Sequence, residues 1–266
     1  MSDKKDVNRI LNVIPSKDTQ NDWSMDTAVE AGMLAAPAAL PAAVDLRQGW
    51  WKVGDQGGTG ACVGWGTAEG VLRLHFANAG RIPKTDKGML SPRFIWMAAK
   101  ETDEFITRPT TFIESDGTSL KSALDIARKF GVVKNSVLPF SSGTLYQGEV
   151  DVFYAIASQL KIASYFNFQK NFNQWRTWLS SNGPILAALS VDATWDNASA
   201  THGNLDVFQP GTVRGGHCIS IVGYRADGRF IVRNSWGTTW GDQGFGFATE
   251  AYIQAAFFNE AYGVKL

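Results

Sequence analysis

Two segments of the 266-residue chain carry side chains that could together cleave an acyl bond. In the first, residues 56–65, a glycine-rich loop delivers Cys62 to the start of a predicted helix. A helix N-terminus concentrates unpaired N–H groups and positive dipole charge, which favour a thiolate over a thiol. Because Cys62 is one of only two cysteines, a structural disulfide explains it poorly. We interpret Cys62 as a nucleophile whose thiolate this segment stabilises.

A cysteine nucleophile needs a base within hydrogen-bond reach, and the chain has three histidines. His75 lies on the same predicted helix as Cys62, roughly 20 Å away at about 1.5 Å per residue. His202 falls in a polar stretch that is typical of a surface loop. His217 follows two glycines at the start of an apolar strand, and it is the histidine that we expect to meet Cys62.

The second segment begins with Asn234, at the end of a predicted strand, and continues into two tryptophans and closely spaced glycines. An asparagine carbonyl can accept the imidazole N–H of His217 and so fix its tautomer and ring plane without adding charge. The ring of Trp236 could shield that hydrogen bond from water. The pattern therefore predicts a cysteine, a histidine and an asparagine acting together.

The composition excludes several other classes of function. Lys+Arg and Asp+Glu number 25 each, and the formal net charge of zero gives no support to a nucleic-acid or anionic-membrane partner. No apolar window is long enough to span a membrane, and the N-terminus has no apolar core of the signal-peptide type. Two cysteines suit a reducing compartment, so we expect a cytoplasmic protein, with export by a signal-less route left open.

Residues 1–39 differ from the rest of the chain. They contain a short extended run at 7–15 and a short helix at 24–32, and a proline-punctuated linker follows at 35–43. We therefore predict an N-terminal extension that ends near Leu40. It is too apolar for a free tail, and we hypothesise that it packs on the domain and covers a cleft; a non-inhibitory brace is the alternative. The apolar residues are Ile10, Leu11, Val13, Ile14, Trp23 and Met33.

The first half of the remaining chain has mainly helical patterns. Helices are expected from Cys62 to about residue 76, from Ser91 to about residue 98, and from Thr118 or Ser119 to about residue 130. Three glycines in the first of these helices each cost roughly 1 kcal/mol relative to alanine, which predicts close packing against a large neighbour. They are Gly64, Gly66 and Gly70.

The second half is rich in predicted strands, with one short helix at 172–179. We therefore expect an α+β protein of two lobes, a helical lobe at about 45–140 and a β-rich lobe at about 141–266, with the site in the cleft between them. The predicted strands span 161–168, 184–191, 218–224, 230–234, 244–249 and 257–264.

The motifs resemble the three signature blocks of papain-like cysteine peptidases. These blocks are the Gln-Gly-x-x-Gly-x-Cys run that ends at Cys62, the Gly-His pair at His217 that leads into a strand, and the Asn-Ser-Trp-Gly run that begins at Asn234. The Leu-Pro-x-x-Val-Asp-Leu-Arg run at 40–47 also resembles the start of the mature enzymes. The resemblance covers the chain from Leu40 to its end and implies the two-lobed fold of that family, with a β-barrel-like C-terminal lobe.

The resemblance implies a role for each residue in an endopeptidase that works through a thioester. Cys62 is the nucleophile, His217 the general base and then acid, and Asn234 the residue that orients His217. Gln56 would donate its side-chain amide to the oxyanion beside the Cys62 backbone N–H. It implies no cofactor and no metal, a peptide or protein as substrate, and a monomer.

Further positions are assigned to substrate binding by the resemblance. Gly117 and Thr118 resemble an edge that pairs with substrate backbone, although an ordinary helix entry explains them equally well. Cys218 stands where relatives have a small residue beside the second substrate residue upstream of the scissile bond; a redox partner for Cys62 is the alternative. Trp236 completes the predicted set.

The sequence also departs from the family pattern. Thr59 stands where many relatives have a bridged cysteine, and no cysteine remains for the usual disulfides. Val63 replaces a common tryptophan after the nucleophile, and Gly216 replaces a common aspartate before the histidine. None of these positions supplies an atom of the predicted triad, so they concern specificity and pH dependence and leave the reaction type unchanged.

Two other functions remain open on the sequence alone. A papain-like module without activity could bind peptides or a partner protein. A transpeptidase could form the same acyl-enzyme and pass it to an amine.

Overall fold

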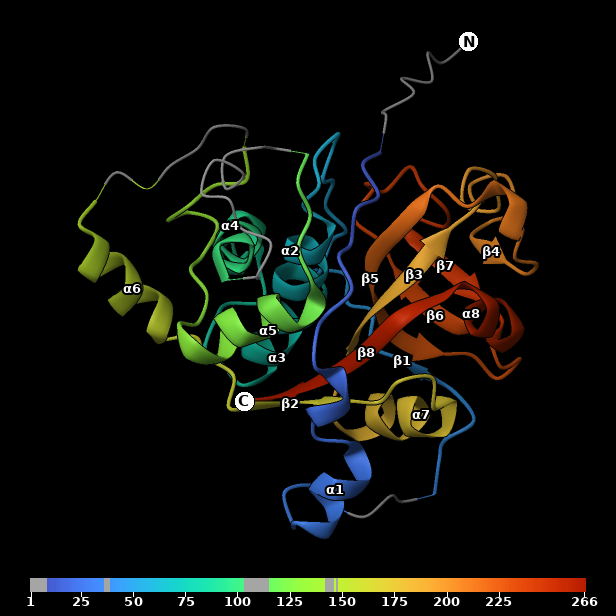
Figure 1. The fold of residues 1–266 in the computed structure, drawn as a ribbon, viewed down its shortest axis with the longest axis horizontal. Coiled ribbons are helices and arrows are strands. Elements are labelled where there is room, and N and C mark those ends of the chain that lie inside the picture. The colour runs from blue at the N-terminus through green and yellow to red at the C-terminus, as the bar shows by residue number, and fades with distance from the viewer. Residues whose placement is uncertain (1–8, 36–38, 103–114, 142–145, 147) are drawn as a thin grey trace.

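The computed structural model describes residues 9–35, 39–102, 115–141, 146 and 148–266. Helices gather on one side of the molecule and a sheet on the other, and the first described residues run between the two sides (Figure 1). The predicted α+β organisation in two lobes is confirmed. The charged start of the chain and the first residues of the run expected at 7–15 lie outside the described residues, as does part of the expected linker.

The helix expected from Cys62 is continuous, but its middle turn is wound as a π-helix. The ranges are α2 Cys62–Thr67, the π-helix η2 Ala68–Leu72 and α3 Arg73–Asn78. A Cβ at Gly64 would lie 2.3 Å from the Pro92 carbonyl oxygen, and one at Gly66 would lie 2.7 Å from Cys218 Sγ. The close packing predicted from the glycines is confirmed, and α2 is the element that joins the two lobes.

The π-helix carries a buried acid that fixes the central helix to its surroundings. Glu69 pairs with Arg73 at 2.6 Å and accepts the backbone N–H of Leu90 at 2.7 Å. Burial raises the pKa of Glu69, and the nearby Arg73 acts in the opposite direction. Removing one partner of such a pair leaves an uncompensated buried charge, so the pair holds the helix that begins at Cys62.

Two helices begin at the serines that predicted them. Ser91 Oγ accepts the Phe94 N–H at 3.0 Å at the start of α4 Pro92–Thr102, and Ser119 Oγ accepts the Ser122 N–H at 3.2 Å at the start of α5 Leu120–Lys129. Both helices pack beside α2 and form the helical lobe.

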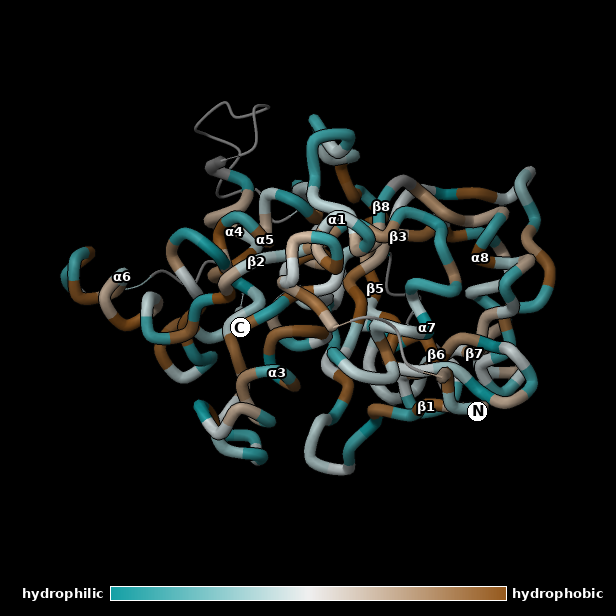
Figure 2. Tube along the Cα trace, turned by 90° about the horizontal axis from the view of Figure 1, so that it is seen from below, coloured by the Kyte–Doolittle hydropathy of each residue, from teal (hydrophilic) through white to brown (hydrophobic). Residues whose placement is uncertain are grey.

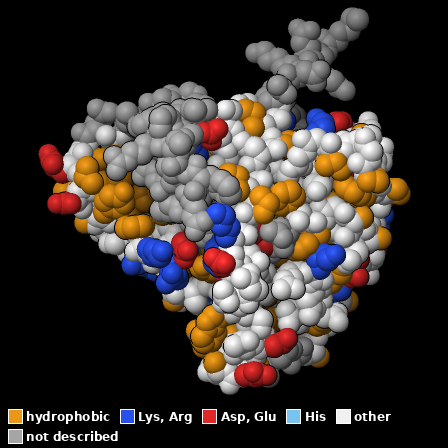
Figure 3. Space-filling model, in the orientation of Figure 1, with side chains coloured by type: hydrophobic (Ala, Val, Ile, Leu, Met, Phe, Trp, Pro, Cys, Tyr) orange, Lys and Arg blue, Asp and Glu red, His pale blue; other side chains and the backbone are white. Residues whose placement is uncertain are grey.

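The structure adds helix α6 Val150–Ser158, which the sequence patterns missed. It packs on the helical side, where Phe153 contacts Phe94 edge to face and the Val132 N–H bonds the Ala157 carbonyl. The helical lobe therefore includes residues beyond 141, where the sequence predicted the boundary between the two lobes. Most of the helix faces solvent, and Val150 and Val152 are exposed. Hydrophobic side chains gather on the surface at this side of the molecule (Figure 3). This weak amphipathic pattern explains why no helix was predicted.

The β-rich side is one eight-stranded sheet in the described part of the chain, in the order β2-β8-β3-β5-β6-β7-β4, with β1 paired to β5. Neighbouring strands are antiparallel except for the β4–β7 pair. The strands are β1 Val44–Asp45, β2 Ser164–Asn167, β3 Ile185–Val191, β4 Asn204–Leu205, β5 Gly215–Tyr224, β6 Phe230–Arg233, β7 Phe245–Ala248 and β8 Phe257–Lys265.

Strands β3 and β5 are buried on both faces. Alternate residues join two cores: Ala188 and Cys218 face the helices, whereas Ala187 and Ile219 face the interior of the β-rich lobe. The hydropathy trace is accordingly brown around β3 and β5 in the centre of the molecule (Figure 2). Burial on both sides explains the uninterrupted apolar runs that predicted these strands.

Two helices pack on the β-rich lobe, α7 Phe172–Ser181, which was predicted, and α8 Glu250–Ala256, which was not. The N-terminal extension contributes the short 3-10 helix η1 Thr19–Asn21 and α1 Met25–Glu30, and Ser24 Oγ caps α1 by accepting the Thr27 N–H. A further short helix, η3, spans Asp86–Gly88, and another, η5, spans Pro210–Thr212. Among the described residues, no helix is long and apolar enough to cross a membrane.

Candidate active site

Cys62 is the first residue of α2, and none of its surface is exposed to solvent. Burial raises the pKa of the thiol to about 11, while the backbone N–H groups of Cys218, Val63 and Cys62 itself act in the opposite direction. The packing of α2 on β5 brings the thiol beside the residue that follows His217. Burial therefore opposes the thiolate at Cys62, whereas the backbone donors around the sulfur favour it.

His217 lies on β5 and is fully buried. Its Nε2 lies 2.7 Å from Asn234 Oδ1, so this nitrogen carries the proton and donates it to the amide oxygen. The other nitrogen, Nδ1, is buried and has no hydrogen-bond partner among the described residues. Burial lowers the pKa of His217 to about 4, and the bond to Asn234 opposes that shift. The result is a neutral imidazole whose Nδ1 is an unoccupied acceptor.

Tryptophan rings enclose the pair formed by His217 and Asn234. The Trp236 ring lies 4.8 Å from the His217 ring at 36°, and Trp195 meets the same ring edge on at 5.7 Å. Trp195 is held in turn, because its indole N–H donates to the Tyr252 hydroxyl at 2.9 Å. The expected shielding role of Trp236 agrees with this contact. A contact between Trp195 and His217 was not predicted, because a loop tryptophan carries no local signal of what it touches.

Gln56 joins the loop that precedes Cys62 to the segment after Asn234. Its Oε1 accepts the Ser235 hydroxyl at 2.8 Å, its Nε2 donates to the Thr59 carbonyl at 2.9 Å, and its backbone N–H bonds the Ser235 carbonyl at 2.8 Å. The side chain is almost completely buried. A primary amide has two N–H groups, so the bond to Thr59 uses one of them and leaves the other for a further acceptor.

The N-terminal extension lies across this site. Residues 9–16 form a segment, here called the arm, that passes between the lobes (Figure 1). The Val13 N–H donates to the Gly216 carbonyl at 3.2 Å, and the Ile14 N–H donates to the Thr118 carbonyl at 3.2 Å. The arm therefore bonds the backbone beside His217 on one lobe and the start of α5 on the other.

Arg9 fixes the beginning of the arm. Its guanidinium lies 2.5 Å from the Asp55 carboxylate, donates to the Gly57 carbonyl at 3.0 Å, and lies 5.7 Å from the centre of the Trp236 ring. All three partners belong to the two loops that carry Gln56 and Asn234. No sequence signal connects Arg9 with residues so far along the chain.

Three of the four predicted substrate-binding residues contact the arm. A Cβ at Gly117 would lie 1.9 Å from the Asn12 carbonyl oxygen, so only glycine lets the arm approach there. The Thr118 carbonyl accepts a bond from the arm, and Trp236 lies under Arg9. Cys218 is buried, and its thiol is free, as is that of Cys62.

The other two histidines lie elsewhere, as the sequence predicted. His202 is an exposed residue of a turn. His75 is on α3, where burial lowers its pKa to about 4 and its Nε2 has no partner within the described ranges. No group of three or more His, Cys, Asp or Glu side chains in the described part of the chain is placed to hold a metal ion.

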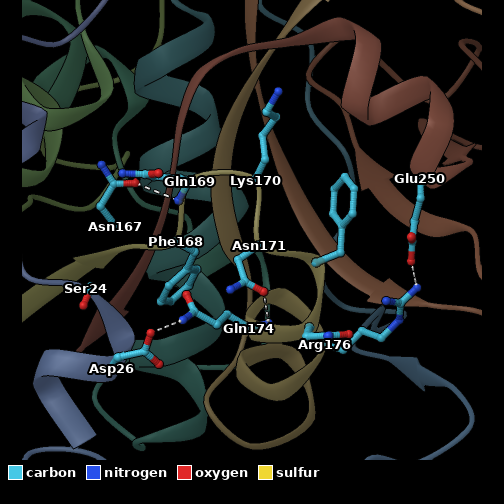
Figure 4. A pocket seen from close by; sticks show the side chains of 12 residues that line it. Ser24, Asp26, Asn167, Phe168, Gln169, Lys170, Asn171, Gln174, Arg176 and Glu250 are labelled. Carbon is cyan, nitrogen blue, oxygen red and sulfur yellow. Dashed lines mark hydrogen bonds and ion pairs between the residues drawn. The ribbon is translucent and has the colours of Figure 1, made fainter. Parts of the chain in front are cut away.

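A separate cavity of about 680 Å³ lies between α1 and α7 (Figure 4). Its polar side chains bond one another: Gln174 donates to Asp26 at 3.0 Å, and Arg176 pairs with Glu250. Asp26 belongs to the N-terminal extension, so this contact anchors the extension on the β-rich lobe. The cavity includes none of the predicted site residues.

Comparison with known proteins shows to which family the chain belongs. A family model for papain family cysteine proteases matches residues 40–255. The chain belongs to the papain family of cysteine proteases. Macrodontain-1 from Ananas macrodontes is 32% identical over 115 residues, which are 43% of this chain and 51% of that protein. The chain thus spans about half the length of this papain-family relative.

Solved structures show the same fold. Xylellain, a cysteine protease from Xylella fastidiosa, aligns with a TM-score of 0.75 at 21% identity and covers 100% of this chain and 99% of that one. Procathepsin L2 from the larval midgut of Tenebrio molitor aligns with a TM-score of 0.72 at 17% identity. The alignment covers 100% of this chain and 81% of that one. The predictions of a papain-like fold and of membership in the papain family of cysteine proteases are confirmed.

Proposed function

We propose that this papain-family chain is an endopeptidase that hydrolyses peptide bonds in peptides or proteins through a thioester on Cys62. One arrangement carries the proposal: a buried thiol at a helix N-terminus lies beside the strand that holds His217 against Asn234. An imidazole with one nitrogen fixed and the other unoccupied is suited to take a proton and return it.

The reaction follows from these groups. His217 Nδ1 takes the thiol proton, and Cys62 Sγ attacks the carbonyl carbon of the substrate. The negative oxygen accepts hydrogen bonds from the Cys62 N–H and the remaining N–H of Gln56. When the C–N bond breaks, His217 gives its proton to the leaving amine. It then takes a proton from water, the hydroxide attacks the thioester, and the thiol is restored as the acid product leaves.

We also propose that the arm holds this site closed. Its backbone occupies the Gly216 and Thr118 carbonyls, and both Cys62 and His217 are completely buried while it is in place. Burial opposes the charged forms of both groups, with pKa values of about 11 and about 4, so the thiolate–imidazolium pair does not form under the arm. The alignment of a procathepsin with all of this chain, extension included, supports this proposal.

A thiol-directed peptide epoxide tests the function. We expect one adduct on Cys62, cleavage of unfolded casein at neutral pH, and loss of both in Cys62→Ala. The variant Arg9→Ala, run in parallel, separates a covered site from an inactive one. No adduct and no cleavage in either chain would show a silent binding module, and a product mass that includes an added amine would show a transpeptidase.

A further inference from the structure

A loop near the candidate site is fastened by a buried acid that the reaction above does not use. The loop spans residues 192–214, between the end of β3 and the start of β5, and its first residue is Asp192. None of the surface of Asp192 is exposed to solvent. A buried carboxylate is costly unless donors bond its oxygens, so the donors to Asp192 show what this acid holds in place.

Donors from the loop and from α8 bond the Asp192 carboxylate. Its Oδ2 accepts the Gln209 backbone N–H at 2.6 Å and the Thr194 hydroxyl at 2.9 Å, and both donors belong to the loop. Its Oδ1 accepts the hydroxyl of Tyr252, on α8, at 2.6 Å. The carboxylate therefore closes the loop on itself and fastens it to α8.

The Tyr252 hydroxyl connects this anchor to Trp195. It accepts the Trp195 indole N–H at 2.9 Å while it donates to Asp192, so the three groups form one directed chain of hydrogen bonds. Bonds in such a chain polarise one another, and a charged final acceptor strengthens them. Burial, together with the bond to Asp192, raises the pKa of Tyr252, so the hydroxyl keeps the proton that the chain requires.

The chain of hydrogen bonds ends at a ring that packs on His217. The Trp195 ring meets the His217 ring edge on, at 5.7 Å and 88°, while Trp236 lies against the same imidazole at 4.8 Å. The bond to Asn234 holds Nε2 of the imidazole, whereas the two indoles limit how far the ring can turn about that bond. The direction of Nδ1, which must take the proton of Cys62, therefore depends on where the Trp195 ring lies.

We propose that Tyr252 is a positioning residue that acts through Trp195 to hold the His217 imidazole in its reactive orientation. The inference rests on the proposed function, because a reaction that moves a proton at His217 Nδ1 requires that orientation. Asp192 in turn orients the Tyr252 hydroxyl. A small displacement of a reacting group slows the chemical step much more than it weakens the binding of substrate, so the effect belongs in kcat.

Steady-state kinetics on the full-length chain test this inference. The substrate is a fluorogenic peptide amide whose sequence comes from a casein site that the wild-type chain cleaves. The epoxide label counts the reactive Cys62 in each sample, so unfolded protein does not enter kcat. Tyr252→Phe removes one hydroxyl and keeps the ring. We expect kcat to fall about tenfold and KM to change by less than about twofold, because an arm that competes with substrate affects KM.

A double-mutant comparison shows whether Tyr252 acts through Trp195. Trp195→Phe keeps an aromatic ring beside His217 and removes the N–H that Tyr252 accepts, so it should lower kcat by itself. In the Trp195→Phe background, Tyr252→Phe should change kcat by less than about twofold. The matched control is Tyr224→Phe, because the Tyr224 hydroxyl donates to the Pro41 carbonyl at 2.9 Å, away from the site, and its loss should leave kcat unchanged.

The outcomes separate this inference from the proposed function. An unchanged kcat per active site in a folded Tyr252→Phe chain overturns the inference. So does a tenfold fall that recurs in full in the Trp195→Phe background, because Tyr252 then acts by another route. If Tyr252→Phe does not fold, Trp195→Phe decides: kcat within about twofold of wild type overturns the inference, and a fall of about tenfold with unchanged KM supports it. Neither labelling nor cleavage in the wild-type chain overturns the proposed function, and this inference with it.

Discussion

Loosening the arm at Arg9 should make Cys62 measurably more reactive. The guanidinium is mostly buried, its side chain being 15% exposed, and it bonds the Asp55 carboxylate and the Gly57 carbonyl. Both partners lie in the loop that precedes Cys62. Arg9→Ala removes these contacts while leaving the backbone bonds of Val13 and Ile14 in place, so it shifts the balance between covered and open arm. It also removes a positive charge that lowers the pKa of His217.

The size of the effect follows from the exposure of each contact. The Asp55 side chain is half exposed, so the ion pair contributes about 0.5–1 kcal/mol. The bond from a charged donor to the Gly57 carbonyl contributes about 1.5 kcal/mol, at the low end for such bonds because the site is only partly buried. The total of about 2 kcal/mol corresponds to a roughly 30-fold larger open fraction.

The assay is alkylation of Cys62 by iodoacetamide in the full-length chain, followed by peptide mass. When the arm opens and closes faster than the reagent reacts, the rate is proportional to the open fraction, so we expect Arg9→Ala to react roughly 30-fold faster than wild type. High salt should narrow the difference by screening the ion pair. Arg229→Ala, which breaks a surface pair with Asp206, is the matched control. Equal rates in a folded Arg9→Ala protein would refute the covering role of Arg9.

Three further predictions concern the site and its scaffold. Asn234→Ala leaves the His217 Nε2–H enclosed without its acceptor, and a loss of about 1–3 kcal/mol should lower kcat by roughly 10- to 100-fold and also lower the midpoint of thermal unfolding. Gly66→Ala drives a Cβ into β5 and should destabilise the chain by about 1–3 kcal/mol in urea unfolding, whereas Gly49→Ala, with no neighbour within 4 Å, should cost far less; equal costs would contradict the packing argument. The imidazoles of His217 and His75 have pKa values lowered from 6.5 to about 4, so folding favours their neutral forms. Their contribution to the free energy of unfolding is complete above pH 6.5 and falls by about 3 kcal/mol for each group as the pH drops toward 4. His75→Gln should remove about half of this pH-dependent loss of stability.

Much of the scaffold follows from local patterns. Serine side chains that bond N–H groups three residues ahead begin α4 and α5, and a local hydrogen bond can be predicted from nearby residues alone. The strands β3 and β5 follow from uninterrupted apolar runs. By contrast, α6 and α8 were missed because their short patterns are weak, and the π-helix within the central helix depends on where Glu69 finds its partners.

The sequence by itself determined which groups could do chemistry: one activatable cysteine, one usable histidine, and an asparagine after a strand. Only the tertiary structure decided how they are presented. The path of the arm depends on bonds between residues about two hundred positions apart, from Val13 to Gly216, and the contact of Trp195 with His217 depends on a loop. The pKa values of the thiol and the imidazole are likewise set by burial, a property of the whole packed molecule that no local run of residues specifies.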